Sequence, residues 1–152
     1  MRRDTKIAAA VFLPVPLLIL GASALTSIAI ANGASTKWRL LFRAMCHGLA
    51  RRCLTILDVP MPICARCVGI YVGLAAGLLT FLCMPRLRGK ALQVAVFVAS
   101  MPMAIDGFTQ AFGLRESTNP LRLATGFIAA FFFGLWALSA VEHREPQPFT
   151  SS

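Results

Sequence analysis

Two short cysteine motifs offer the clearest chemistry in this sequence. Cys46 is followed directly by His47, and Cys64 and Cys67 are separated by two residues. A Cys-x-x-Cys pair can hold one metal ion or close a small disulfide, because two intervening residues let both sulfur atoms converge. The Cys–His pair would complete a set of four ligands. We therefore expect Cys46, His47, Cys64 and Cys67 to form a site for zinc or another transition metal, or a redox-active thiol centre.

The position of the Cys-x-x-Cys pair also favours reactive thiols. The pair stands at the start of an expected helix, and Arg66 lies between its two cysteines. A helix N-terminus and a neighbouring cation both favour the thiolate form. The alternative is that these are inert buried thiols, since a free cysteine packs as a small hydrophobic side chain. Cys53 is left open between these roles, and Cys83 is interpreted as a packing residue.

A second group of polar residues interrupts the later apolar runs. Asp106 lies about 9 Å inside the end of its run at 1.5 Å per residue, and Gln110 shares its helix face. A carboxylate at that depth indicates either a functional site or an ion pair that locks helices together. Its expected partners are Arg115 and Arg122. The candidate catalytic residues are Asp106, Arg115, Glu116 and Arg122, and the polar residues expected beside them are Arg66, Gln110, Ser117 and Asn119.

Composition places these residues in a membrane protein. Of the 152 residues, 57% are hydrophobic and 14% are charged, whereas soluble domains are about 45–50% apolar and about 25% charged. A spanning helix needs about 20 apolar residues, and four runs come near that length: about 7–31, 68–84, 91–112 and 121–141. The runs are continuously apolar rather than alternating, which indicates helices and not a β-barrel. We expect an all-α, polytopic membrane protein: one domain over residues 1–152, a four-transmembrane-helix bundle with a polar tail at 143–152.

The segments around the spans have their own signals. The first run follows a basic start and resembles a secretory signal, but it continues past the usual 7–15 apolar residues, which favours a retained anchor. Residues 38–45 predict an interfacial helix between the first two spans, with Trp38 and the arginine stems at headgroup depth. Pro60 and Pro62 cannot continue a helix and lead into the second span. Small-residue stripes predict that the second and fourth spans touch: Gly69, Gly73 and Gly77, and Gly126, Ala130 and Gly134.

The charge pattern indicates the partner and the topology. The net charge is +9, and the basic residues lie between apolar runs, where anionic lipid headgroups are the natural counterions. No nucleic-acid-binding module is present, so we expect the lipid bilayer and no nucleic acid as partner. Four spans put both termini on one side of the cell membrane, and they put the interval at 32–67, with Cys46, Cys64 and Cys67, and the loop at 113–120 on the other. The basic loop at 85–90 favours termini in the cytoplasm.

Four motifs in order resemble a known family. They are Cys46-His47, Pro62-Ile-Cys-Ala-Arg-Cys-Val-Gly-Ile-Tyr-Val-Gly73, Ile105-Asp-Gly-Phe-Thr-Gln110 and Gly113-Leu-Arg-Glu-Ser-Thr-Asn-Pro-Leu-Arg-Leu-Ala-Thr-Gly126. Together they resemble the small prokaryotic membrane proteins of domain of unknown function family 2085, over a core at residues 46–126. The resemblance supplies no activity. It implies that the residues assigned above, from Cys46 to Arg122, occupy motif positions, whereas residues 48–53 depart from the family's charged and aromatic stretch.

Three functions fit these features. The leading hypothesis is a metal-binding or redox-active membrane protein with one polar site at the mouth of the bundle. The second is a quinone-linked thiol oxidoreductase, because the disulfide-generating membrane enzymes of bacteria also have four spans and a Cys-x-x-Cys at the start of the second. This chain lacks their second cysteine pair. The third is a transport or assembly factor that binds its substrate at Asp106 and the arginines. A second copy of the chain or another membrane protein remains open as a partner.

Overall fold

The computed structural model describes residues 3–84, 90–114 and 116–143. Its α-helices are α1 Arg3–Phe12, α2 Pro14–Ala31, α3 Ala65–Cys83, α4 Lys90–Ala111 and α5 Asn119–His143. Between α2 and α3 lie two 3-10 helices, η1 Thr36–Phe42 and η2 Ala50–Arg52, and two strands, β1 Cys53–Ile56 and β2 Val59–Cys64. The basic loop at 85–89, Arg115 and the tail at 144–152 lie outside the described residues.

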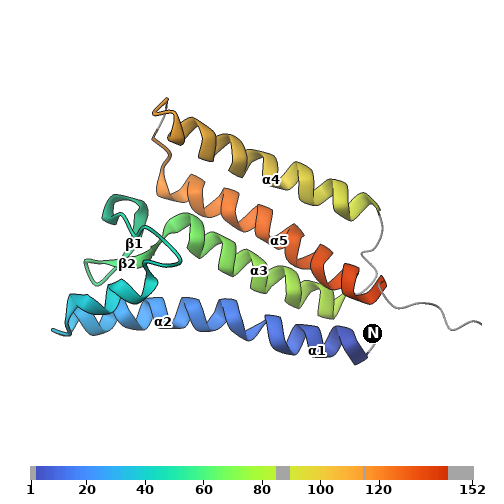
Figure 1. The fold of residues 1–152 in the computed structure, drawn as a ribbon, viewed down its shortest axis with the longest axis horizontal. Helices are drawn as coiled ribbons and strands as arrows, with labels where there is room; N and C mark the ends of the chain where they lie inside the picture. The colour runs from blue at the N-terminus through green and yellow to red at the C-terminus, as the bar shows by residue number, and fades with distance from the viewer. Residues whose placement is uncertain (1–2, 85–89, 115, 144–152) are drawn as a thin grey trace, which may run out of the picture.

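Four helical stretches are long and apolar enough to cross a membrane. They are Thr5–Ala31, Ala65–Cys83, Lys90–Ala111 and Asn119–Glu142, which confirms the expected four-span bundle. The first stretch consists of α1 and α2, which meet at Leu13 because Pro14 has no N–H to continue the helical hydrogen bonds. In Figure 1 the start of α1 and the end of α5 lie at one end of the bundle, and the β-strands lie at the other.

The centre of the bundle is a close, parallel contact between α3 and α5. A Cβ atom at Gly73 would collide with the backbone of Phe127, and one at Gly126 would lie 2.6 Å from the carbonyl oxygen of Arg66. Each collision involves backbone, which cannot move aside as a flexible side chain can. The expected contact between the second and fourth spans is therefore present, and it places Arg66 beside the first turns of α5.

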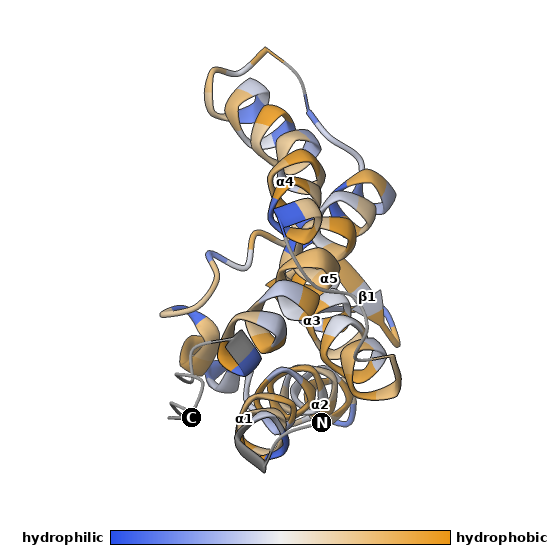
Figure 2. Ribbon diagram, turned by 90° about the vertical axis from the view of Figure 1, so that its right-hand side faces the viewer, coloured by the Kyte–Doolittle hydropathy of each residue, from blue (hydrophilic) through white to orange (hydrophobic). Residues whose placement is uncertain are grey.

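The outer faces of the helices are apolar and exposed. α4 packs against α5 at the edge of the bundle (Figure 1), and its exposed side chains include Phe97, Val98, Ile105 and Phe108. Figure 2 shows hydrophobic residues around most of each span. Exposed apolar surface of this extent on helices of spanning length is the surface that lipid covers.

The segment between α2 and α3 differs from the expectation in two ways. Where a helix over 38–45 was expected, the chain forms the 3-10 helix η1, held to the bundle by the buried Phe42, which packs with Met61, Ile63 and Val68. It is followed by an antiparallel hairpin that pairs Cys53 with Cys64 and Ile56 with Val59. Both turn residues of the hairpin, Leu57 and Asp58, have positive φ, of 50° and 61°. A two-residue turn of this kind is usually Asn-Gly or Asp-Gly, so Leu57 and Asp58 do not predict a hairpin.

Candidate functional site

Three cysteine sulfur atoms meet where the hairpin joins α3. The Sγ atoms of Cys46, Cys64 and Cys67 all lie within 4.8 Å of one another, and those of Cys64 and Cys67 are 3.5 Å apart. All three side chains are partly buried and unbridged. We call these three residues the sulfur cluster. They come from two segments separated by 18 residues, which only the hairpin brings together.

Local structure explains how each sulfur reaches the cluster. Cys64 is the last residue of β2 and the N-cap of α3, and Cys67 lies in the first turn of that helix. Cys46 closes the turn after η1, where its backbone N–H donates to the carbonyl oxygen of Phe42 at 2.9 Å. The Cys46 sulfur then accepts a hydrogen bond of 3.3 Å from the backbone N–H of Cys64.

The pKa values of Cys53 and Cys64, which pair across the hairpin, are shifted in opposite directions. A hydrogen bond from the Cys67 thiol, supported by backbone N–H groups at the start of α3, lowers the pKa of Cys64 to about 5. Cys53 is 3% exposed, and burial raises the pKa of its thiol to about 11. The Cys53 thiol donates to the carbonyl oxygen of Leu49 at 3.2 Å. Cys64 therefore favours the thiolate, the form that binds metals and attacks disulfides, and Cys53 favours the thiol.

The structure separates the other sulfur and imidazole groups from the cluster. His47 is exposed and lines a pocket with Arg39 and Arg43; it is not in the group of converging ligand atoms found in the described part of the chain. Cys53 lies on the neighbouring strand outside that group, and Cys83 is exposed at the far end of α3. The sequence signal for His47 was its adjacency to Cys46, but successive side chains rarely point to one centre.

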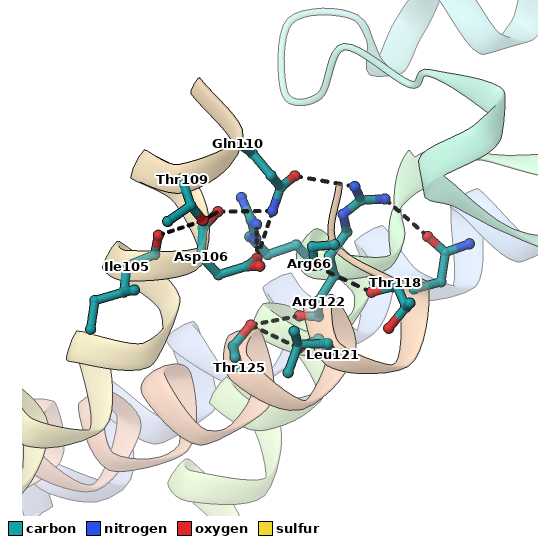
Figure 3. Close-up of polar contacts among 11 residues, drawn as sticks. Arg66, Ile105, Asp106, Thr109, Gln110, Thr118, Leu121, Arg122 and Thr125 are labelled. Carbon is teal, nitrogen blue, oxygen red and sulfur yellow. Dashed lines mark hydrogen bonds and ion pairs between the residues drawn. The ribbon is translucent and has the colours of Figure 1, made fainter. Parts of the chain in front are cut away.

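A series of polar side chains crosses the same end of the bundle. Arg66, from the first turn of α3, forms an ion pair with Asp106 of α4. Gln110, one turn further along α4, donates to the same carboxylate oxygen at 2.8 Å. Asp106 is 7% exposed. Figure 3 shows these three side chains pointing toward one another between the helices.

The series continues through α5 to the hairpin. Arg122 donates to the Gln110 side-chain oxygen at 3.1 Å and to the Asn119 side-chain oxygen at 3.2 Å (Figure 3 shows the first of these). Asn119 in turn donates to the backbone carbonyl of Cys53 at 3.2 Å. Arg122 is 4% exposed, which is rare for a charged residue without such partners. We call Arg66, Asp106, Gln110, Arg122 and Asn119 the polar relay.

The relay differs from the sequence expectation in its pairing. The direct partner of Asp106 is Arg66, whereas Arg122 reaches the carboxylate only through Gln110. The cause is the close contact of α3 with α5, which lets the Arg66 side chain extend toward α4. Sequence reasoning assigned Arg66 to thiolate support from its place between two cysteines. The position of Arg66 between two cysteines in the sequence did not show where its guanidinium group would point.

The remaining loop residues lie apart from the relay. Glu116 forms an ion pair of 3.0 Å with Arg51, with both side chains mostly exposed. Ser117 is buried and its hydroxyl donates to the carbonyl oxygen of Thr118 at 3.4 Å. Arg115 lies outside the described residues. Sequence reasoning missed the pocket residues Arg39 and Arg43, which it placed at headgroup depth only; their shared helix face was the available signal.

Comparison with known proteins places this arrangement in a family. The family described as predicted membrane protein DUF2085 matches residues 46–136. The chain belongs to this family. The matched part of this DUF2085 protein contains the sulfur cluster, the relay and most of α5, and it leaves out α1, α2 and η1.

Two archaeal relatives are similar to this DUF2085 protein. An uncharacterized protein of Methanocaldococcus jannaschii is 40% identical over 93 residues, and these cover 60% of the chain and only 60% of the relative's own length. An uncharacterized protein of Methanothermobacter thermautotrophicus is 37% identical over 100 residues, covering 66% of the chain and 88% of the relative. No solved structure matches the chain.

Proposed function

We propose that this membrane protein binds a soft or borderline metal ion through Cys46, Cys64 and Cys67, with zinc as the default. The observation that carries the proposal is the convergence of the three sulfur atoms within 4.8 Å. Thiolates bind zinc and monovalent copper far better than they bind magnesium or calcium. A disulfide needs two sulfur atoms, so it would not account for the third.

The spacing of the sulfur atoms supports this assignment. With zinc–sulfur bonds of about 2.3 Å in a tetrahedral site, neighbouring sulfur atoms lie about 3.8 Å apart. The sulfur atoms of Cys64 and Cys67 are 3.5 Å apart, and the Cys46 sulfur lies within 4.8 Å of both. The lowered pKa of Cys64 also reduces the proton competition that a metal ion must overcome.

Three protein ligands leave one coordination position open. Structural zinc sites are closed by four protein ligands, whereas sites that exchange or activate a ligand keep one position for a small molecule. Because the cluster supplies three, it suits a centre that accepts an exogenous ligand or passes its metal on. The polar relay then has a structural role beside the centre, since it ties α3, α4 and α5 to the strand that holds Cys53.

Metal content of purified variants tests the proposal. Wild-type protein in nanodiscs, reduced and then dialysed against zinc, should retain about one zinc per chain, the stoichiometry of a single site. Cys46→Ser, Cys64→Ser and Cys67→Ser should each lose most of it. Cys83→Ser is the matched control, because Cys83 is exposed at the opposite end of α3. Equal zinc content in all four variants would rule out the site.

A second candidate is thiol–disulfide exchange, favoured by the placement of Cys64 at the N-cap of α3 with Cys67 at 3.5 Å. In this reaction a partner thiolate attacks the Cys64–Cys67 disulfide and forms a mixed disulfide. The partner's second thiolate then attacks the mixed disulfide and releases the cysteine of this protein as a thiolate. The partner is left with a disulfide, and Cys64 and Cys67 are left as a dithiol. The dithiol then passes two electrons and two protons to a membrane quinone. The quinone becomes the quinol, and the Cys64–Cys67 disulfide forms again.

The two candidates give different results in one experiment. An exchange enzyme needs only the Cys64–Cys67 pair, so Cys46→Ser would keep the oxidation of a reduced substrate peptide in the presence of a soluble quinone. A metal centre needs Cys46 as well. Loss of zinc in Cys46→Ser without peptide oxidation in wild type selects the metal centre, and the reverse pattern selects exchange.

The orientation of the protein remains a proposal of its own. We propose that both termini are cytoplasmic and that the sulfur cluster faces the other side of the membrane, because of span parity and the basic residues between the second and third spans. Reporter fusions at Ser152 and in the loop at 85–90 should both read cytoplasmic. A split result would contradict the four-span topology.

A further inference from the structure

A small polar pocket opens beside the sulfur cluster. It has a volume of about 270 Å³ and lies between η1, the turn that follows it and β2. Its lining includes Arg39, Arg43, Cys46 and His47. By contrast, the groove between α3 and α5 near Leu54 has an entirely apolar lining. The pocket is therefore set apart from the grooves that lipid chains fill.

The pocket carries positive charge that the described part of the protein leaves uncompensated. Arg39 lies in η1 and Arg43 directly follows that helix, and neither forms an ion pair with the described residues. Arg39 donates to the backbone carbonyl of Met61 at 3.4 Å, which holds its side chain near β2. Among the described residues, none that lines the pocket is acidic. Two guanidinium groups and an imidazole around a small pocket provide the donors that anionic oxygens need.

Backbone geometry at Gly48 keeps the pocket close to the cluster. Gly48 has a φ of +57°, and a Cβ atom there would lie 2.9 Å from the carbonyl oxygen of Pro62. This glycine lets the turn after Cys46 pack directly on β2, two residues before Cys64. Cys46, whose sulfur belongs to the cluster, also lines the pocket.

We propose that this pocket binds a small anion bearing phosphate or carboxylate oxygens, held by Arg39, Arg43 and His47 next to the Cys46 sulfur. The anion has two sources to distinguish, a soluble molecule and the headgroup of an anionic lipid, because η1 exposes Trp38, Leu40 and Leu41, side chains of the kind found at membrane interfaces. Binding depends on the arginines and not on the metal. The pocket is thus a second binding site beside the proposed metal site. It would place an anion next to the coordination position that the three cysteines leave open.

Calorimetric titration of inorganic phosphate tests the soluble source. The protein is placed in phosphatidylcholine nanodiscs, and sodium chloride of equal ionic strength serves as the blank. Wild type should bind phosphate saturably. Arg43→Gln, at an exposed position, should weaken binding about tenfold or more, the loss expected for a charge-assisted hydrogen bond. Arg51→Gln is the matched control, because Arg51 is exposed and pairs with Glu116 outside the pocket.

A second experiment tests the lipid source and asks whether anion binding requires bound zinc. In nanodiscs that contain phosphatidylglycerol, native mass spectrometry should show the lipid retained by wild type and lost from Arg39→Gln/Arg43→Gln if the headgroup is the ligand. Wild-type protein stripped of zinc by a chelator should bind the anion as the zinc-loaded protein does. Absence of binding in both experiments, or an equal loss in Arg51→Gln, would overturn the proposal.

Discussion

The sulfur cluster and the polar relay lie at the same end of the bundle and are built in opposite ways. In the cluster, three ligand atoms converge and are held mainly by the backbone. In the relay, each side chain binds the next, from Arg66 through to Asn119. Three converging thiol ligands suit a group from outside, whereas polar side chains that each bind the next fix the helices that carry them. We therefore propose that the cluster carries the chemistry and that the relay stabilises the bundle.

The largest effect is expected from breaking the relay. Asp106→Asn leaves the Arg66 guanidinium without its carboxylate between α3 and α4, and losing one partner of a buried ion pair costs about 3–5 kcal/mol. Thermal unfolding in detergent should show a large loss of stability. The zinc content per folded chain should stay near that of wild type.

The exposed ion pair supplies the control for this substitution. Glu116→Gln removes the partner of Arg51, where the two side chains are 72% and 65% exposed. Exposed pairs contribute at most about 1 kcal/mol, so its melting curve should barely move. If Asp106→Asn melts like Glu116→Gln and yet loses zinc, the roles of the relay and the cluster would have to be exchanged.

Added metal should stabilise the protein through the cluster alone. At a free zinc concentration one hundred times Kd, binding to the folded state contributes about 2.7 kcal/mol. The melting temperature of wild type and of Cys83→Ser should therefore rise with zinc, and that of Cys46→Ser should not. An equal rise in all three would show that zinc binds elsewhere.

A smaller loss is expected where α3 and α5 touch. Gly126→Ala places a Cβ atom 2.6 Å from the carbonyl oxygen of Arg66, and overpacking of this kind typically costs about 1–3 kcal/mol. The change also moves Arg66 relative to Arg122, so the relay should weaken before the cluster does. Gly21→Ala is the control, because nothing lies within 4 Å of its added Cβ. Thermal unfolding of the two variants gives the comparison.

The subtlest difference lies between the two cysteines paired across the hairpin. In reduced, metal-free protein, iodoacetamide should label Cys64 readily at pH 7 and leave Cys53 largely unlabelled. The pKa of Cys64 is lowered to about 5, so its labelling rate should fall only as the pH drops through that value. The pKa of Cys53 is raised to about 11. Mass spectrometry after timed quenching measures both, and faster labelling of Cys53 would contradict the assigned environments.

The membrane architecture was predictable because it depends on the average hydrophobicity of runs of about 20 residues. Four apolar runs and the glycine spacing in α3 were enough to predict four spans and the contact of the second with the fourth. The closeness of Cys64 and Cys67 was also predictable, since two intervening residues at the start of a helix let their sulfur atoms converge. These features depend on composition and short spacings, which need no knowledge of the tertiary fold.

The missed features depend on backbone conformation and side-chain direction. The hairpin turns at Leu57 and Asp58, which adopt positive φ without the residues that normally signal it. The partner of Asp106 depends on how α3 and α5 approach, and the exclusion of His47 depends on the direction of one side chain. The pocket of Arg39 and Arg43 exists only because η1 folds back on β2.

X-ray absorption at the zinc edge tests the central claim most directly. Zinc-loaded protein in nanodiscs should give a first shell of three sulfur atoms at about 2.3 Å and one nitrogen or oxygen atom at about 2.0–2.2 Å. Cys83→Ser should give the same first shell, whereas Cys46→Ser should retain too little zinc to show a shell of three sulfur atoms. A first shell made only of nitrogen and oxygen would contradict a metal centre built from Cys46, Cys64 and Cys67.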